Sequence, residues 1–335
     1  MDVVDVRILR ELAQANSVYP ARPGLGASYR GIARTLSVSP GTVRNRVLRM
    51  AATGVLTGSS VYANPNLLGL EVGAYAVEVS PSRRKREVVD RLRGLEGVYF
   101  LQNFRGNLLG VIFAYPDARS RKRTVGAVHR ITGAESGLFS RVSYPPCHVT
   151  LSGSEWKLLA RLIRGPFSTY AALARELRVS PRTVKRQVAK LVHARAVLSV
   201  PTVDYRALSG CVPADLLVVY TSPSVRHEAE RKILGLVGDR MVFAGVWVDF
   251  GMYSLILPKV SAATEIAEEV SRLPGVGTSR VEIVEEHIDQ VHVLWKYVDR
   301  QLAPLSNSRG RPAAVVTNSM VAARSGGTRS SRGPP

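Results

Sequence analysis

The spacing of apolar residues predicts three short helices in each of two stretches of the chain. Amphipathic helices are expected at residues 3–14 and 29–36 in the first stretch, and at 154–163 and 170–177 in the second. A Val-Ser-Pro sequence follows in both, and it predicts the start of a third helix because serine caps a helix and proline fits its first turn. The buried stripes of the third helices, at i, i+4 and i+7, are Val43, Val47 and Met50 in one stretch and Val184, Val188 and Leu191 in the other.

A short β-prone segment follows each group of three helices. It begins near Val55 in the first stretch and near Val197 in the second. Residues 57–60, Thr-Gly-Ser-Ser, have the composition of a hairpin turn. Both stretches are therefore predicted to be winged helix-turn-helix domains.

Two longer stretches have strand and helix patterns in the order βαββαβ. The first has expected strands at 71–79, 98–104, 108–115 and 136–143, with helices at 82–95 and 120–131. The second has expected strands at 214–221, 241–248, 253–257 and 278–286, with helices at 224–236 and 262–273. This order predicts an antiparallel four-stranded sheet with two helices on one face, the ferredoxin-like arrangement. The fold class is thus α+β, with two winged helix-turn-helix domains alternating with two ferredoxin-like domains, and residues 288–298 are expected to add a helix.

The two halves of the chain also match in sequence, since residues 28–50 resemble residues 169–191. A period this long indicates duplication of a whole two-domain unit. The expected domains are winged helix-turn-helix at 1–63 and 149–206, ferredoxin-like at 64–148 and 207–300, and a disordered basic tail at 301–335, which has no acid and few large apolar groups.

Charge and composition narrow the class of protein. The 335 residues include 46 Lys and Arg against 26 Asp and Glu, a formal net charge of +20, and this charge is uneven, at +8 in residues 149–206 but −4 in residues 207–300. Such local concentration indicates a polyanionic partner. Two cysteines, Cys147 and Cys211, are too few for a disulfide framework, and no stretch is long and apolar enough for a membrane span. A cytoplasmic protein without a membrane partner is expected.

The exposed faces of the two third helices carry the side chain types that contact DNA in a helix-turn-helix. There Arg reads guanine and Asn or Gln reads adenine in the major groove, while Lys and capping residues hold phosphates. A solvated basic helix is the alternative for either helix alone, but two copies with the same cap, turn and wing favour double-stranded DNA. The expected DNA-binding residues are Ser39, Thr42, Arg44, Asn45, Arg46 and Arg49 in the first helix, and Ser180, Arg182, Thr183, Lys185, Arg186, Gln187 and Lys190 in the second.

With these elements in place, the chain resembles the Lrp/AsnC, or feast/famine, family of transcription regulators over about residues 1–298. Residues 2–12 resemble that family's first helix, residues 32–47 its recognition motif, and residues 65–69 the linker that follows. The resemblance implies a sequence-specific transcription factor whose ferredoxin-like (RAM) domains pair with each other and bind amino acids or similar small effectors. Because this chain has two such domains, an internal pseudo-dimer that reads an asymmetric site is expected, and its further homo-oligomerisation is left open.

The resemblance also places a small-molecule effector at the turn between the second and third strands of the RAM domain. The family pattern there is Gly, two residues, Asp. This chain has Gly106-Asn107-Leu108-Leu109 in one copy and Gly251-Met252-Tyr253-Ser254 in the other, so the aspartate is missing from both. Gly106, Asn107, Gly251 and Tyr253 are the expected effector-binding residues. An insertion at residues 17–27 is a further departure from the family pattern.

An enzyme is the alternative class of protein. Siroheme decarboxylases resemble the same two-domain layout and use the βαββαβ half as a tetrapyrrole pocket, and residues 104–109 are slightly similar to their Arg- and Asn-containing strand. Two basic, acid-free helices favour the regulator, because an enzyme does not need them. The histidines are scattered and no catalytic triad or phosphate loop stands out, so no catalytic residue, metal or cofactor is expected.

Overall fold

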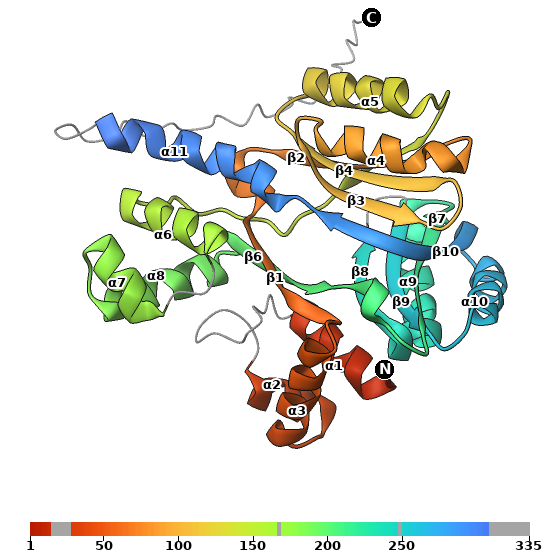
Figure 1. Cartoon of the computed structure of the whole chain (residues 1–335), viewed down its shortest axis with the longest axis horizontal. Coiled ribbons are helices and arrows are strands. Elements are labelled where there is room, and N and C mark those ends of the chain that lie inside the picture. The colour runs from red at the N-terminus through yellow and green to blue at the C-terminus, as the bar shows by residue number, and fades with distance from the viewer. Residues whose placement is uncertain (15–27, 166–168, 247–249, 308–335) are drawn as a thin grey trace, which may run out of the picture.

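The computed structural model describes residues 1–14, 28–165, 169–246 and 250–307, and it confirms the predicted fold class (Figure 1). Two winged helix-turn-helix domains alternate along the chain with two ferredoxin-like domains. Within the described ranges, every helix is too short or too polar to cross a membrane. The insertion at residues 17–27 and most of the predicted tail, residues 308–335, lie outside the described residues.

The first helix-turn-helix consists of α1 (Val3–Gln14), α2 (Tyr29–Leu36) and α3 (Pro40–Ala52). Helices α2 and α3 begin where the sequence supplies a cap, because the hydroxyls of Ser28 and Ser39 accept hydrogen bonds from backbone N–H groups of the first turn. Ser37 ends α2 in the left-handed region, with a φ of 54°, and this reverses the chain into α3. The predicted apolar stripe of α3 is buried against α1 and α2.

The second helix-turn-helix repeats this construction with α6 (Gly153–Arg164), α7 (Tyr170–Leu177) and α8 (Pro181–His193). Thr169 and Ser180 cap α7 and α8, and Arg178 takes the left-handed position with a φ of 55°. The apolar stripe of α8 is buried in a core that also includes α6 and both wings. The same local signals therefore give the same turn in both domains.

The wings of the two domains pair with each other. Strand β1 (Leu56–Ala63) lies antiparallel to β6 (Val197–Val203), with Ser60 opposite Val200. The predicted hairpin turn at residues 57–60 is wrong, because these residues lie within β1. Their partner strand is more than 130 residues away in the sequence, and a local turn pattern contains no information about it. The β1–β6 ladder joins the two helix-turn-helix domains directly.

Each ferredoxin-like half has the strand order fourth, first, third, second, as expected for this fold. The first half consists of β2 (Glu71–Glu78), α4 (Lys85–Arg93), β3 (Val98–Phe104), β4 (Leu108–Tyr115), α5 (Ala118–Thr132) and β5 (Leu138–Val142). The second half consists of β7 (Val212–Tyr220), α9 (Pro223–Val237), β8 (Met241–Val246), β9 (Phe250–Leu257), α10 (Ser261–Ser271) and β10 (Val276–Asp289). Strand β9 begins at Phe250, three residues before its predicted start.

The two four-stranded sheets join edge to edge into one eight-stranded sheet. Strand β10 makes this joint, because residues 276–283 pair with β7 and residues 284–289 pair with β3. The faces of the two halves that lack helices pack against each other around Phe104, Leu217 and Met252. Helices α4 and α5 cover the opposite face of the first half, and α9 and α10 cover that of the second (Figure 1).

The C-terminal helix starts later than predicted. Strand β10 continues to Asp289, a short 3-10 helix follows at Val291–Leu294, and α11 spans Trp295–Asn307. Helix α11 packs on α6, where Arg164 lies 2.5 Å from an oxygen of Asp299. The predicted boundary between domain and tail at residue 301 therefore falls inside a helix.

Candidate nucleic-acid interface

The N-terminal halves of α3 and α8 present polar side chains that face solvent. Arg44 and Asn45 on α3 are exposed, as are Arg182, Lys185 and Arg186 on α8. Within the described part of the chain, the side chains of these five residues form no hydrogen bond and no ion pair. Guanidinium, ammonium and amide groups placed in this way can reach base edges and phosphates.

The predicted capping residues fix the first turn of each helix. The Ser39 hydroxyl accepts a hydrogen bond from Thr42 N–H at 2.9 Å, and the two hydroxyls lie 2.8 Å apart. Ser180 and Thr183 repeat both contacts in α8, at 3.1 and 2.9 Å. These four residues thus have a structural role, to which any phosphate contact would be an addition.

The C-terminal half of α3 is ion-paired with α1. Arg46 Nη1 lies 2.6 Å from Asp2 Oδ2 and 2.9 Å from Asp5 Oδ1, and Arg49 Nη2 lies 2.7 Å from Asp5 Oδ2. Asp5 is buried, with 1% of its surface exposed. Burial opposes ionisation of Asp2, but hydrogen bonds from Arg46 and the backbone outweigh it and lower the pKa of the Asp2 carboxyl.

Helix α8 has the matching arrangement with α6. Lys190 Nζ lies 2.8 Å from Glu155 Oε1, and Gln187 Nε2 donates to Ser154 Oγ at 2.9 Å. Both Gln187 and Glu155 are buried. The acid also accepts a hydrogen bond from Ser152 N–H, which completes a capping box at the start of α6.

Four predicted DNA contacts, Arg46, Arg49, Gln187 and Lys190, therefore bind the first helix of their own domain in this structure. Their helical phase places them beside the buried stripe, where the acids of α1 and α6 can reach them. A sequence signal for this exists, because Asp5 and Glu155 occupy the apolar faces of α1 and α6, in phase with Leu9 and Leu159. We term Asp5–Arg46–Arg49 and Glu155–Lys190 the acid clamps.

The acid clamp of the second domain predicts a specific pH dependence. Burial opposes ionisation of Glu155, but bonds from Lys190 and Ser152 hold the pKa of its carboxyl below the ordinary value of 4.5. The stabilisation is therefore present above pH 4.5 and is lost as the pH falls through the lowered pKa. Glu155→Gln should cost about 1–3 kcal/mol of unfolding free energy at pH 7 and should flatten the pH dependence between about pH 5 and 3. Urea unfolding at several pH values measures both, and an unchanged slope with pH would contradict the clamp.

The predicted effector turn in the first half is exposed, and two of its carbonyl groups are bonded to the protein. Gly106 lies in the β3–β4 turn with a φ of +90°, a conformation that favours glycine. Its carbonyl accepts a hydrogen bond from Lys85 Nζ at 2.8 Å, and the Asn107 carbonyl accepts one from Val79 N–H at 2.9 Å. Lys85 is buried, and this burial lowers the pKa of its ammonium group.

The predicted turn position of Gly251 and Tyr253 in the second half is wrong. Gly251 lies within β9 opposite Val218 of β7, just as Leu109 of β4 lies opposite Val77 of β2. The register thus makes Gly251 the counterpart of Leu109, and the counterpart of Gly106 lies in residues 247–249, outside the described ranges. The sequence-based alignment of Gly251 with Gly106 was therefore wrong by three residues.

Gly251 and Tyr253 belong instead to the core beneath α9 and α10. Tyr253 is fully buried with its hydroxyl 2.6 Å from that of Tyr220, and burial raises the pKa of Tyr253. A Cβ at Gly251 would lie 2.6 Å from the Tyr220 hydroxyl. These contacts describe a packed interior, which offers no opening to a ligand at this position.

Gly251→Ala should therefore destabilise the protein by about 1–3 kcal/mol, because the added methyl group overpacks the core. Gly235→Ala is a matched control, since this glycine lies in α9 with nothing within 4 Å of a Cβ. The control should be neutral or stabilising by up to about 1 kcal/mol, since alanine favours the helix. Denaturant unfolding of both variants measures the difference, and equal midpoints would contradict the described packing.

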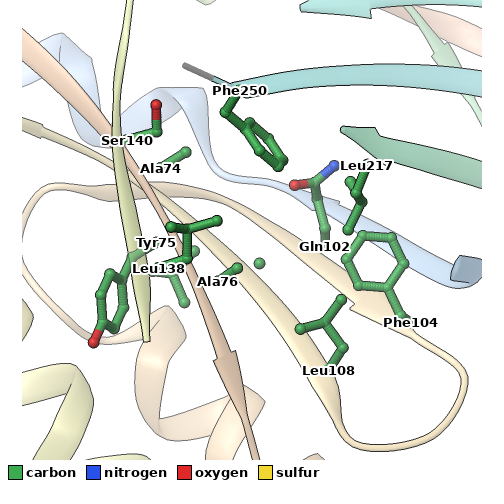
Figure 2. A pocket seen from close by; sticks show the side chains of 12 residues that line it. Ala74, Tyr75, Ala76, Gln102, Phe104, Leu108, Leu138, Ser140, Leu217 and Phe250 are labelled. Atoms are coloured by element: carbon green, nitrogen blue, oxygen red, sulfur yellow. The ribbon is translucent and has the colours of Figure 1, made fainter. Parts of the chain in front are cut away.

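A small cavity lies between the helix-free faces of the two halves. Figure 2 shows Leu217 and Phe250 of the second half near Gln102, Phe104 and Leu108 of the first. Its volume is about 30 Å³, enough for one or two water molecules. Every residue that lines it is uncharged, and Gln102 and Ser140 supply polar side chains.

A buried polar cluster at the joint between the halves was not predicted from the sequence. Gln102 Nε2 on β3 donates to Asp215 Oδ2 on β7 at 3.1 Å, and His287 Nε2 on β10 lies 3.5 Å from the same oxygen. The ring of Tyr205 lies 4.9 Å from that of His287 and at 80° to it. Burial, followed by the charge of Asp215, raises the pKa of Tyr205. The sequence signal was a single acid within the apolar strand β7.

Comparison with known proteins finds a relative by sequence. No protein-family model matches the chain. The HTH-type transcriptional regulator Ptr1 of Methanocaldococcus jannaschii is 34% identical over 115 residues, which cover 34% of this chain and 71% of Ptr1.

Comparison with solved structures extends over most of the chain. Siroheme decarboxylase NirDL, in complex with an iron-uroporphyrin III analogue, is similar with a TM-score of 0.53 at 15% identity, covering 89% of this chain and 98% of NirDL. AsnC of E. coli covers 45% of this chain, with a TM-score of 0.31 and 20% identity. At this level of identity the NirDL comparison shows a shared fold and no more.

Proposed function

Because the chain belongs to the HTH-type transcriptional regulators, we propose that it binds double-stranded DNA in a sequence-specific manner and regulates transcription as a protein of the Lrp/AsnC type. The observation that carries the proposal is the set of exposed, unpaired side chains at the N-terminal halves of α3 and α8. These are Arg44, Asn45, Arg182, Lys185 and Arg186, which we term the free recognition set. In a helix-turn-helix this half of the helix meets the base edges.

The two helices are proposed to read different half-sites. Lys185 stands at the position of Arg44, and Arg186 at that of Asn45, so the groups offered to the DNA differ in the two copies. Pairing of β1 with β6 supports simultaneous binding, because it ties the two helix-turn-helix domains together within one chain. The operator is therefore expected to be asymmetric, with an arginine-read guanine in each half.

The salt dependence of DNA binding tests the proposal. If all four cations of the free recognition set neutralise phosphates, log affinity falls with log salt at a slope of about −3.6, from about −0.9 per phosphate, and each arginine that reads a guanine instead makes the slope shallower by about 0.9. If the cations of the acid clamps also contacted phosphates, the slope would approach about −6. Fluorescence anisotropy with a duplex selected from random DNA measures it. Absence of any sequence preference after selection would contradict a specific regulator.

A small-molecule effector is part of the proposal for the first half only, where Gly106 and Asn107 form the β3–β4 turn. The joint at β3 and β10 lies beside this turn, since Arg105 N–H donates to the carbonyl of Ile283 at 2.7 Å. Thermal shift measurements with each amino acid test for an effector, because a ligand of the folded state raises the melting temperature.

A siroheme decarboxylase is the second candidate function, because the NirDL likeness covers both halves of the chain. The cavity between the halves fits a tetrapyrrole poorly. Its volume is about 30 Å³, whereas ligand pockets are typically about 300–1,000 Å³. No lining residue is an arginine, lysine or histidine that could bind the carboxylates of such a substrate. A shift in the absorbance of siroheme on titration with the protein, followed by loss of carboxylates, would favour the enzyme.

A further inference from the structure

The helix layers of the two ferredoxin-like halves have opposite charge. In the first half, the 3-10 turn Ser82–Arg84 with α4 and α5 contains eleven basic residues and two acids. In the second half, α9 and α10 together contain three basic residues and five acids. The two layers occupy equivalent places in the fold, so the difference in charge does not follow from the architecture. We term the first of them the basic layer, comprising residues 82–93 and 118–132.

Most cations of the basic layer have no acidic partner. Lys85 is buried, and Arg91 and Arg93 are 3.9 Å from Glu87 and Asp90. Seven others are exposed, and in the described residues no carboxylate lies within ion-pair distance of them: Arg83, Arg84, Arg86, Arg119, Lys122, Arg123 and Arg130. Four of the seven form one stripe along α5, because positions 119, 122, 123 and 130 lie on the same side of a helix. Unpaired like charges held this close repel each other and favour a polyanion.

The basic layer is remote from both recognition helices. In Figure 1, α5 and α4 form the upper layer of the molecule, α3 lies at the bottom and α8 at the lower left. The eight-stranded sheet and α11 lie between them. A straight duplex held by α3 and α8 therefore does not pass over the basic layer.

We propose that the basic layer is a second DNA-binding surface, which holds the phosphate backbone of a duplex segment other than the one that α3 and α8 read. The basic layer is not expected to recognise bases, because exposed arginine and lysine side chains on the outside of a helix layer neutralise phosphates without entering a groove. One molecule then bridges two DNA segments, one held by sequence and the other by charge. The inference rests on the proposed function only for the first segment.

A second copy of the chain is a poorer partner for the basic layer than DNA. Its own acidic counterpart, α9 with α10, has most of its carboxylates in ion pairs already, including Glu228 with Lys232 and Glu230 with Arg226, both at 2.8 Å. An anionic lipid surface is also a poorer partner. None of the exposed large apolar side chains of the described residues lies on α4 or α5, so the layer has nothing to insert into a bilayer.

A bridging experiment with the full chain tests the proposal. One duplex containing the selected site is immobilised on beads, and capture of a second, fluorescent duplex of scrambled sequence is measured at low salt. The test variant is Arg119→Gln, Lys122→Gln, Arg123→Gln, which removes three exposed charges from the stripe on α5. The matched control, Arg231→Gln, Lys259→Gln, Arg272→Gln, makes the same change in net charge on the second half, at three exposed positions.

We expect the test variant to lose at least tenfold in capture of the second duplex and to bind the selected site within twofold of the unmodified protein. The salt slope of capture should fall by about 2.7, and the control variant should behave as the unmodified protein. Equal capture by both variants would overturn the proposal. If the test variant lost self-association in sedimentation together with capture, the proposal would be overturned in favour of a second copy of the chain. If the unmodified protein bound anionic vesicles in preference to DNA, the proposal would be overturned in favour of a lipid surface. Retention of site binding in the test variant separates all these outcomes from a failure of the proposed function.

Discussion

Arg186→Ala is expected to weaken binding to the preferred DNA site by about 1–3 kcal/mol and to relax base preference at one position. Arg186 is exposed, lies in the N-terminal half of α8 and has no partner in the described residues. Its guanidinium can therefore bridge a guanine bidentately without first breaking an internal contact. Its loss should leave the free energy of unfolding within about 0.5 kcal/mol, as for most exposed positions.

Lys190→Ala is the matched control on the same helix, because it also removes one cation. Here the cation is paired with the buried Glu155, so the expected cost falls on folding, at about 1–3 kcal/mol, with little change in the salt slope. Anisotropy titrations and urea unfolding of both variants separate the two effects. If Lys190→Ala lowered the salt slope by one unit and left stability intact, the clamp would not persist on DNA.

Val61→Asp is expected to reduce affinity for a complete operator by about 100-fold or more while leaving binding to isolated half-sites weak but measurable. Val61 is buried in β1 opposite Ser199 of β6, and a charge there opposes pairing of the wings. Once the wings separate, the second domain no longer binds at the effective concentration that the ladder provides. Titrations with whole and half operators measure the loss.

Two further variants test whether the effect of Val61→Asp comes from loss of wing pairing. Thr57→Asp places the same charge on the same strand at an exposed position, where it removes only the hydrogen bond from the Thr57 hydroxyl to the Thr202 carbonyl, so it should retain most of the affinity. Val200→Asp perturbs the partner strand β6 and should reproduce the effect of Val61→Asp. Circular dichroism confirms that helices persist in each variant. Full operator affinity in both ladder variants would show that the domains act independently.

The elements of this fold could largely be predicted from the sequence, because their signals are local. Serine or threonine caps and the left-handed residues Ser37 and Arg178 fix the two turns within a few positions. The strands β3 and β4 follow from alternation and a glycine turn, and their predicted bounds match the structure. Pairing between distant strands could not be predicted in this way. Residues 57–60 look like a turn because the strand that satisfies their backbone, β6, lies in the other half of the chain.

The candidate site could likewise be predicted only in part from the sequence. A helical wheel separates the buried stripe of α3 from its polar side, but it does not reveal which polar residues meet another helix. Arg44 and Arg46 look alike in sequence, and only the position of Asp5 on α1 distinguishes a free arginine from a paired one. Likewise, Gly251 resembled a turn glycine until strand register placed it opposite Val218.

Strand β10 has a consequence for how the chain can be divided. Its first part belongs to the sheet of the second half and its last part completes the edge of the first. A fragment ending near residue 148 would therefore expose the unpaired backbone of β3, and it would also leave the wing strand β1 without its partner. Such open edges invite pairing between molecules, so the isolated half should aggregate or exchange strands. We therefore expect that a gene cut near residue 148 would not yield two separately folded halves, however similar the halves are in fold.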